Sequence, residues 1–215
     1  MKVQILEETP KGLLISDGER ATWIMKRQRR ADGTLTPGAV KALSEATTSH
    51  DDMVAKVAEQ DDRRAAHTEN CERPTHHLQL FSDYKLGTNR FCVTDARGKE
   101  LWFGRDFDDP ESQAAGELSA AKKAVWLAGK LAETLGDEAR ACLTLKVDAE
   151  YLCYQQRPNQ KGYVLTKLAA KYGIGLRVEW VSGASNPADE QTAAKRGYQK
   201  WRDADLPAYS EASAA

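Results

Sequence analysis

Alternating apolar and polar positions predict short β-strands in the first part of the chain. Three runs rich in β-forming residues fit short strands, at residues 3–5, 13–15 and 22–25. Residues 36–66 have helical periodicity, and Thr36 followed by Pro37 is a favoured start for a helix. A second helix is predicted to begin near Ser49. These patterns indicate a small N-terminal unit that combines strands and helices.

A longer series of elements begins at residue 77. Alternating positions predict three strands, at residues 77–83, 90–94 and 100–105. The sequence from Asp95 to Gly98 is typical of a hairpin turn, so we expect an antiparallel meander. A helix is predicted over residues 111–135, with Asp109 as its N-cap and Pro110 as its first residue. Glu117 is expected at the edge of the apolar stripe of this helix, where it is partly buried.

The remaining elements follow the same alternation of strands and helices. Residues 143–147 predict a strand that ends on Asp148, and a helix-like stretch follows at once. Further patterns predict a helix at residues 164–173, a strand at 176–181 and a last helix that ends near Trp201. The tail from Asp203 is expected to be frayed.

A change of pattern between residues 67 and 76 predicts a domain boundary, because this stretch is polar and lacks periodicity. We therefore expect an N-terminal extension at residues 1–70, a main domain at 77–202 and a frayed tail at 203–215. The boundary region contains His67, Cys71, His76 and His77. Their spacing does not match structural zinc sites, which use paired cysteines, so no zinc site is predicted.

The charge balance indicates that any binding of nucleic acid uses local patches. The 215 residues carry a net charge of −1, so no global field attracts phosphates. The densest basic cluster is Lys26, Arg27, Arg29 and Arg30, which fits either phosphate binding or a solvated loop. Trp23 beside it fits a core aromatic residue better than a base-stacking one. A second group is expected on the last helix, at Lys195, Arg196, Lys200 and Arg202.

The cysteines and the hydropathy indicate a cytoplasmic protein. Four cysteines are widely spaced without a CxxC motif, and two of them lie in strand-like runs, where a free thiol packs as a small apolar group. No signal peptide and no apolar run of about 18 residues is present, so we expect a soluble, intracellular chain.

Four carboxylates stand at the ends or centres of predicted elements: Asp83, Glu117, Asp148 and Asp189. Asp148 could simply cap the next helix, and Asp189 could complete a capping box begun by Asn186. Asp83 is harder to explain structurally, because an acid in a central strand has no helix to cap. Carboxylates from different elements suit Mg²⁺, which prefers oxygen ligands, and two cations roughly 4 Å apart can support phosphodiester hydrolysis.

Four motifs in this order resemble the ribonuclease H family over residues 77–202. They are Leu80-Phe81-Ser82-Asp83, Gly116-Glu117-Leu118-Ser119-Ala120-Ala121, Val147-Asp148-Ala149-Glu150-Tyr151-Leu152, and Trp180-Val181-Ser182-Gly183 with Asn186-Pro187-Ala188-Asp189. The last motif is most similar to the ribonuclease H domains of some retroelements. The resemblance implies an α/β fold with a mixed five-stranded sheet flanked by helices, carrying a small N-terminal α+β extension.

The resemblance also implies a site and an activity. Asp83 would bridge two Mg²⁺ or Mn²⁺ ions, Asp189 would help hold the ion that activates water, and Glu117 and Asp148 would hold the ion facing the leaving 3′ oxygen. The implied function is a divalent-metal-dependent endonuclease that cleaves the RNA strand of an RNA–DNA hybrid. Two alternatives remain: a nuclease of the same fold acting on another nucleic acid such as structured DNA, and a non-catalytic module that binds nucleic acid or protein.

Three positions bear on how far the family pattern extends. Ala184 stands where the family has a mobile-loop histidine that aids turnover. The spacing from Asn186 to Asp189 is one residue shorter than usual. Exonuclease relatives carry Asp-x-Glu on the first strand, whereas Lys85 stands at the third position here, which favours the ribonuclease H branch.

Overall fold

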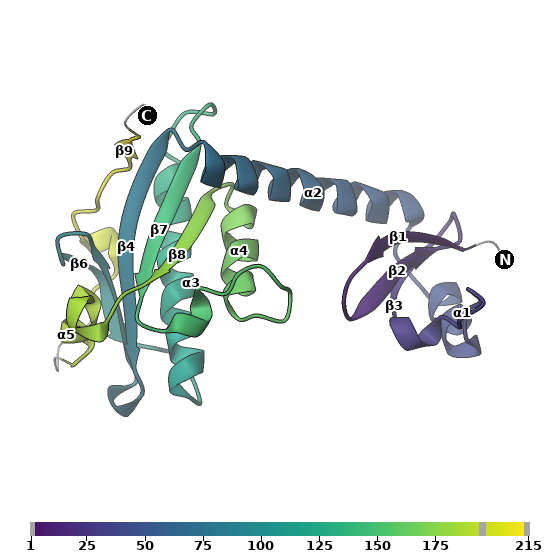
Figure 1. Cartoon of the computed structure of the whole chain (residues 1–215), viewed down its shortest axis with the longest axis horizontal. Helices are drawn as coiled ribbons and strands as arrows, with labels where there is room; N and C mark the ends of the chain where they lie inside the picture. Colours follow the sequence, from purple (N-terminus) through teal and green to yellow (C-terminus); the bar gives the residue numbers. More distant parts are fainter. Residues whose placement is uncertain (1–2, 194–196, 213–215) are drawn as a thin grey trace. The chain divides into compact units, whose positions relative to one another are not determined.

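The computed structural model describes residues 3–193 and 197–212 (Figure 1). The described residues form two compact units, one up to Asp62 and one from Arg63 onward. Among the helices of these described ranges, none is both long and apolar enough to cross a membrane.

The N-terminal unit is a three-stranded antiparallel sheet with one helix packed on it. The strands are β1 (Gln4–Glu8), β2 (Gly12–Ser16) and β3 (Ala21–Met25), in the order β1-β2-β3, which confirms the predicted strands. Helix α1 (Pro37–Ser44) begins after Thr36, whose Oγ1 accepts a hydrogen bond from the Ala39 amide at 3.4 Å. The core of the unit consists of Leu13, Ile15, Ile24, Ala39 and Leu43.

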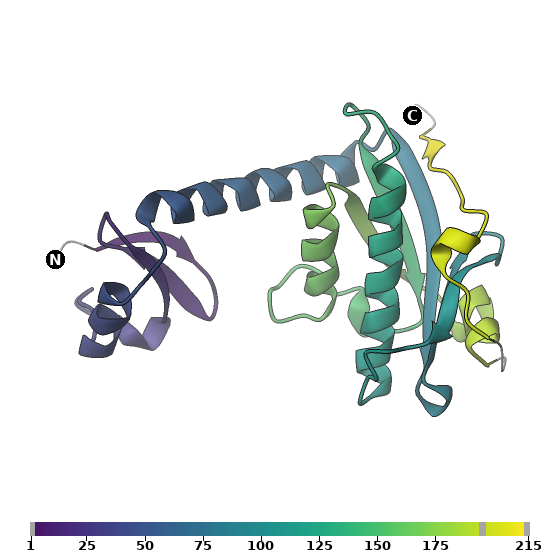
Figure 2. The ribbon, with the colours of Figure 1, turned by 180° about the vertical axis from the view of Figure 1, so that it is seen from behind.

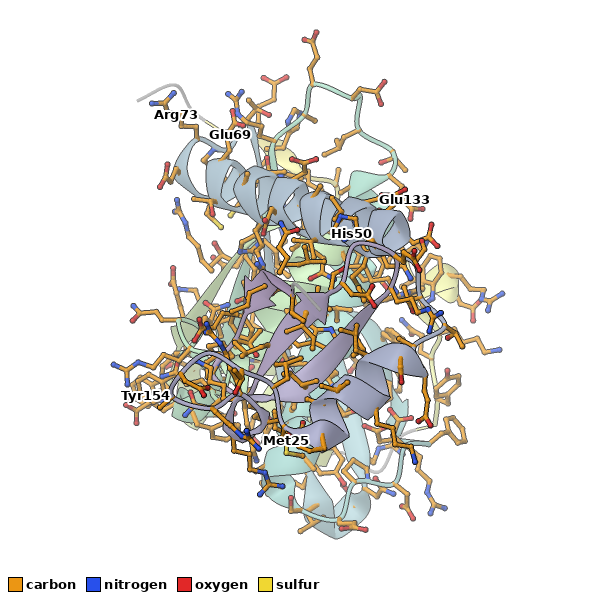
Figure 3. The ribbon with its side chains drawn as sticks, turned by 90° about the vertical axis from the view of Figure 1, so that its right-hand side faces the viewer. Met25, His50, Glu69, Arg73, Glu133 and Tyr154 are labelled. Carbon is orange, nitrogen blue, oxygen red and sulfur yellow. The ribbon has the colours of Figure 1, made fainter. Side chains whose placement is uncertain are left out.

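One prediction for this unit is wrong. Trp23 does not enter the core but is 45% exposed, and Met25, labelled in Figure 3, is 53% exposed. In β3, Ala21 and Ile24 are the buried residues. A sheet with a single covering helix leaves part of its surface open, and these two side chains lie there.

Helix α2 (His50–Glu72) is longer than the sequence pattern predicted. It begins where expected, and Ser49 Oγ accepts a hydrogen bond from the Asp52 amide at 3.1 Å. It then continues through the polar residues after position 66, which lack an apolar stripe. Specific polar contacts hold this end: the side chain of Asn70 donates to the Gly173 carbonyl at 2.8 Å. Figure 3 labels Glu69 on the last turns of the helix and Arg73 just after it.

The second unit is built on one mixed sheet (Figure 1). Its central path has the order β6-β5-β4-β7-β8, in which β5 is antiparallel to β4 and β6, and β7 is parallel to β4 and β8. The predicted class, a mixed α/β fold with a mixed sheet flanked by helices, is confirmed. The strands are β4 (His76–Lys85), β5 (Arg90–Asp95), β6 (Glu100–Arg105), β7 (Ala141–Val147) and β8 (Gly175–Trp180).

Helices cover both faces of this sheet. Helices α3 (Gln113–Ala132) and α4 (Gly162–Lys171) lie side by side on one face, as seen in Figure 2. They enclose the main core with the apolar side chains of β4, β7 and β8. The short helix α5 (Pro187–Ala193) packs on the other face, where Ala188 contacts Phe81 and Cys92.

The start of α3 corrects the sequence prediction. The N-cap is Ser112, whose side chain accepts a hydrogen bond from the Ala115 amide, and not Asp109. Asp109 has φ of 45°, outside the helical region, and its carboxylate accepts a hydrogen bond from Asn89. A long-range contact therefore holds Asp109 in a turn, although its residue type suits a cap.

The helix-like stretch after Asp148 is also shorter than predicted. It is a single 3₁₀ turn, η3 (Glu150–Leu152), before the chain reaches α4. The last helix does not extend to Trp201, because residues 197–200 are not helical and Gln199 pairs with Phe103 through two backbone hydrogen bonds. Trp201 lies in a separate turn, η5 (Trp201–Asp203).

The expectation of a frayed tail from Asp203 is wrong for the described residues. Strand β9 (Ser210–Glu211) pairs antiparallel with the start of β4, so that the sheet has six strands instead of five. Tyr209 is 8% exposed and donates a hydrogen bond to the Ala128 carbonyl at 3.2 Å. One buried aromatic side chain and two ladder pairs are enough to order this segment.

Candidate functional site

Three carboxylates from three separate elements meet at one place in the second unit. Asp83 lies in β4, Glu117 in the second turn of α3, and Asp148 directly after β7. Each offers one oxygen, and these oxygens all lie within 4.8 Å of one another. This group is called the acidic cluster below.

Strand register and one glycine explain why these acids converge. Phe81 of β4 pairs in parallel with Lys146 of β7, so Asp83 and Asp148 each follow this pair by two residues and lie at the same level. Gly116 lets α3 approach β4, because a Cβ there would lie only 1.9 Å from the ring of Tyr84. The next residue, Glu117, is thereby placed against the end of the two strands.

Asp189 lies beside the acidic cluster but is not one of its three members. A Cβ atom placed on Gly183 would lie 3.8 Å from Asp189 Oδ2 and 3.7 Å from Asp148 Oδ2. The two carboxylates therefore face the same small space. Asp189 is partly exposed on α5, so it stands at the rim of the site.

Burial makes the ionised forms of these acids unfavourable. Asp83 is 2% exposed and Glu117 is 5% exposed. Burial, together with the charges of Asp148 and Asp189, raises the pKa of Asp83 to about 6, although a hydrogen bond from Thr192 opposes this rise. The pKa of Glu117 is raised to about 9, mainly by burial and then by the neighbouring charges of Asp83 and Asp148. The pKa of Asp148 is also raised, mainly by burial.

Two polar side chains orient the buried acids. Thr192 Oγ1 donates to Asp83 Oδ2, or alternatively to the Asp189 carbonyl at 2.9 Å. The Gln113 amide donates to both Glu117 and the Tyr84 carbonyl, and its oxygen accepts from the Leu86 amide at 3.0 Å. Sequence reasoning missed both residues. The available signal was spacing, since Gln113 precedes Glu117 by one helical turn.

The charge of the acidic cluster is not balanced by the protein. Among the described residues, no ion pair joins Asp83, Glu117 or Asp148 to a cationic side chain. Asp148 Oδ1 is buried and has no hydrogen-bond partner. Unpaired, buried carboxylate oxygens from separate elements fit a hard divalent cation, which takes oxygen ligands.

An exposed aromatic side chain stands next to the cluster. Trp180, at the end of β8, is 57% exposed, and its indole N–H donates to the Asp148 carbonyl at 3.1 Å. Further along the chain, Tyr154, which is labelled in Figure 3, is 51% exposed, and it donates to Glu150 at 2.9 Å. Tyr151 ties η3 to α3 by donating to the Ala114 carbonyl at 2.8 Å. The chain segment after Asp148 is thus fixed from two sides.

The predicted basic residues are described in part. In the N-terminal unit, Lys26 contacts Glu8, whereas Arg27, Arg29 and Arg30 are exposed. Lys195 and Arg196 fall outside the described residues. Lys200 is exposed and not helical, and Arg202 lies in η5, so these two do not share a helix with α5 as predicted.

Comparison with solved structures finds a similarity to the crystal structure of RNase H1 from the halophilic archaeon Halobacterium salinarum NRC-1. The similarity covers 54% of this chain and 93% of that chain, with 15% sequence identity and a TM-score of 0.38. No protein-family model matches the chain, and no curated protein sequence matches it.

Proposed function

We propose that this protein is a divalent-metal-dependent endonuclease that hydrolyses phosphodiester bonds, with the RNA strand of RNA–DNA hybrids as its substrate. The observation that carries the proposal is the acidic cluster: one oxygen each of Asp83, Glu117 and Asp148 lies within 4.8 Å of the others, and no cation of the described residues pairs with them. The resemblance of the surrounding motifs to ribonuclease H supports the choice of substrate.

Each acid has a separate part in the proposed site. Asp83, Glu117 and Asp148 would hold Mg²⁺ or Mn²⁺, and Asp189 would complete the set from the rim. When bound, two such cations supply a nucleophile at neutral pH and charge stabilisation for the leaving oxygen. Thr192 and Gln113 keep the Asp83 and Glu117 side chains in place, so that the carboxylates need little reorganisation on binding.

A cleavage assay on five substrates tests this proposal. RNA–DNA hybrid, duplex RNA, duplex DNA, branched DNA and single strands are each incubated with the full chain and Mg²⁺, Mn²⁺ or EDTA. Internal cuts in the RNA strand of the hybrid, abolished by EDTA, are the expected result. Cleavage of branched DNA alone would assign the structured-DNA alternative. Binding without cleavage of any substrate would assign a non-catalytic module.

We further propose that the N-terminal unit binds the nucleic acid and contributes little to the chemical step. Arg27, Arg29 and Arg30 are exposed, and Trp23 stands exposed on the preceding strand, where a base can stack on it. Lys26 adds charge but already contacts Glu8. Changing all four cations to Ala should weaken substrate binding. The slope of the logarithm of the binding constant against the logarithm of the salt concentration should become shallower by up to about 0.9 per lost phosphate contact.

The saturated cleavage rate of this quadruple variant should stay within a few-fold of the parent. The matched control is the pair Lys41→Ala and Lys56→Ala, which removes cations of the same unit outside the cluster. Affinity is measured by fluorescence anisotropy across a salt series. If the quadruple variant and the control have the same affinity and salt slope as the parent, the N-terminal unit does not bind nucleic acid through this cluster.

A further inference from the structure

A second group of reactive side chains lies in the second unit, on a part of the sheet that the acidic cluster does not use. It consists of His67 and Cys71 on the last turns of α2 and Cys142 in β7. All four cysteines of the chain are free thiols, and Cys71 is half-buried whereas Cys142 is fully buried. The three residues are called the thiol site below.

The backbone brings α2 very close to the sheet at this point. Cys142 pairs with Gly175 of β8. A Cβ on Gly175 would lie 2.7 Å from the Asn70 carbonyl carbon and 2.8 Å from the Cys71 nitrogen, so only glycine permits this approach. The end of α2 therefore rests on the strand beside Cys142, so that Cys71 and Cys142 approach the same residue, Gly175, from the helix and from the neighbouring strand.

Two nitrogen atoms lie close to Cys71 Sγ. The Leu176 amide donates to it at 3.2 Å, and His67 Nε2 lies 3.8 Å away. His67 Nδ1 donates to the Ile174 carbonyl at 2.8 Å, which fixes the ring with Nε2 directed at the sulfur. This arrangement of an oriented imidazole, a backbone N–H and a thiol is typical of a reactive cysteine.

The electrostatics agree with this geometry. The neighbouring Cys142 thiol lowers the pKa of Cys71 against the effect of burial, and His67 lowers it further. For His67, burial lowers the pKa, but the bonds to Cys71 and to the Ile174 carbonyl outweigh it and raise the pKa overall. The other groups that face the thiol site are Arg177, which donates to the Cys71 carbonyl, and Tyr209, which lies near Cys142. Both shifts favour the Cys71 thiolate and the protonated His67 relative to the same groups in water.

We propose that Cys71 and Cys142 form a reversible disulfide when the protein meets a hydroperoxide, and that this bond fastens the end of α2 to β7. The Cys71 thiolate attacks the terminal peroxide oxygen, an S–O bond forms, and the O–O bond breaks. The leaving alkoxide or hydroxide takes the proton from His67. Cys142 sulfur then attacks Cys71 sulfur, the S–O bond breaks, and hydroxide leaves with the Cys142 proton as water.

In sum, two thiols are oxidised to one disulfide while the hydroperoxide is reduced to an alcohol, or to water, plus one water. Cys142 is the resolving thiol because it is buried and pairs with Gly175, the residue on which Cys71 rests. Cys153 and Cys92 provide internal comparisons. The pKa of Cys153 is raised by burial and by Glu150 and Glu179, and Cys92 is fully buried in β5, so neither is expected to react.

Oxidation of the full-length reduced chain with hydrogen peroxide, followed by alkylation and peptide mass mapping, tests the proposal. The expected product is a linked pair of peptides that contain Cys71 and Cys142, with Cys92 and Cys153 alkylated. The product should disappear with dithiothreitol, and the oxidised chain should unfold at a higher temperature than the reduced chain, because the cross-link restricts the unfolded state. A linkage through Cys153, or no linkage, would overturn the proposal.

Two variants separate reactivity from simple packing. In Cys142→Ala, the sulfenic acid on Cys71 should persist and be trapped by dimedone, with no linked peptides and no rise in melting temperature. In His67→Gln, the pH at which iodoacetamide modifies Cys71 should shift upward, and oxidation near pH 6 should slow severalfold. Cys153→Ala is the matched control and should behave as the parent. An unchanged pH profile in His67→Gln would show that His67 does not activate Cys71.

Discussion

Two groups of buried carboxylates in the second unit differ in what neutralises them. Asp106, after β6, is 1% exposed, and Lys123 Nζ lies 3.0 Å from one of its oxygens. Lys123 also donates to Ser119 at 2.8 Å and lies 4.8 Å from the centre of the Phe91 ring. In contrast, no cation of the described residues pairs with Asp83, Glu117 or Asp148.

The same helix contributes to both groups, which makes the contrast informative. Helix α3 supplies Glu117 to the acidic cluster and Lys123 to Asp106, within two helical turns. A chain that neutralises one buried acid with a lysine has the means to do so at the other. An unneutralised buried charge costs free energy of folding, and a divalent cation bound at the acidic cluster would offset this cost.

The largest expected effect comes from removing one acid of the cluster. Asp83→Asn should lower the cleavage rate by about 1000-fold or more, because several kcal/mol of transition-state stabilisation depend on the bound cations. The fold should be intact or slightly stabilised, since one repelling charge is removed. The control is Asp108→Asn, which changes an exposed acid near Lys123 and should cleave normally. A near-normal rate in Asp83→Asn with Mg²⁺ would rule out this site.

A second effect is a dependence of stability on pH in the metal-free protein. The folded-state pKa values of Asp83, about 6, and Glu117, about 9, lie above their ordinary values of 3.8 and 4.5. The folded state therefore binds more protons, and stability present below pH 4 is lost as pH rises toward 9. We expect the free energy of unfolding to fall on the order of a few kcal/mol over this window.

Urea unfolding at pH 5, 7 and 9 measures this dependence, with and without Mg²⁺. Mg²⁺ should stabilise the protein most at high pH, where the acids are ionised and can bind it. The double variant Asp83→Asn with Glu117→Gln should lose most of the pH slope and the response to Mg²⁺. A metal-free protein that becomes more stable between pH 5 and 9 would contradict the pKa shifts of the cluster.

A third effect concerns Asp106, the buried acid that is paired with Lys123, because removing its partner should lower stability. Lys123→Met leaves Asp106 buried without its cation, which should cost about 3 kcal/mol of unfolding free energy, while the cleavage rate of the folded protein stays near that of the parent. Lys122→Met removes an exposed lysine next to it on α3 and should change stability by less than about 0.5 kcal/mol. Equal stability of the two variants would mean that the Asp106 pair does not stabilise the fold.

The smallest expected effect concerns the loop beside the acidic cluster. Ala184 is exposed in η4 (Gly183–Ser185), next to the glycine that faces Asp148 and Asp189. Ala184→His should raise the multiple-turnover rate a few-fold and leave the single-turnover rate unchanged, if product release limits the reaction. Burst kinetics on a hybrid substrate separate the two rates. A fall in both would show that this loop is not equivalent to the histidine loop of ribonuclease H.

The sequence by itself determined the order and type of most elements. Strands with a period of two are visible without tertiary information, because each presents one face to a core, and β4 to β8 all lie where alternation predicted them. Asp83 stands out in the sequence because an acid in a central strand has no helix to cap. Glu117 stands out at the edge of an apolar stripe, whereas Asp148 also fits a helix cap.

Only the tertiary structure decided where helices begin and end and how deeply the site is buried. Ser112 caps α3 because Asp109 is engaged by Asn89, and Tyr209 orders the C-terminal segment by packing under α3. Gly116 brings Glu117 into the cluster through contact with Tyr84. Local patterns carry periodicity and capping preference, whereas these outcomes depend on partners far away in the sequence, which no window of neighbouring residues contains.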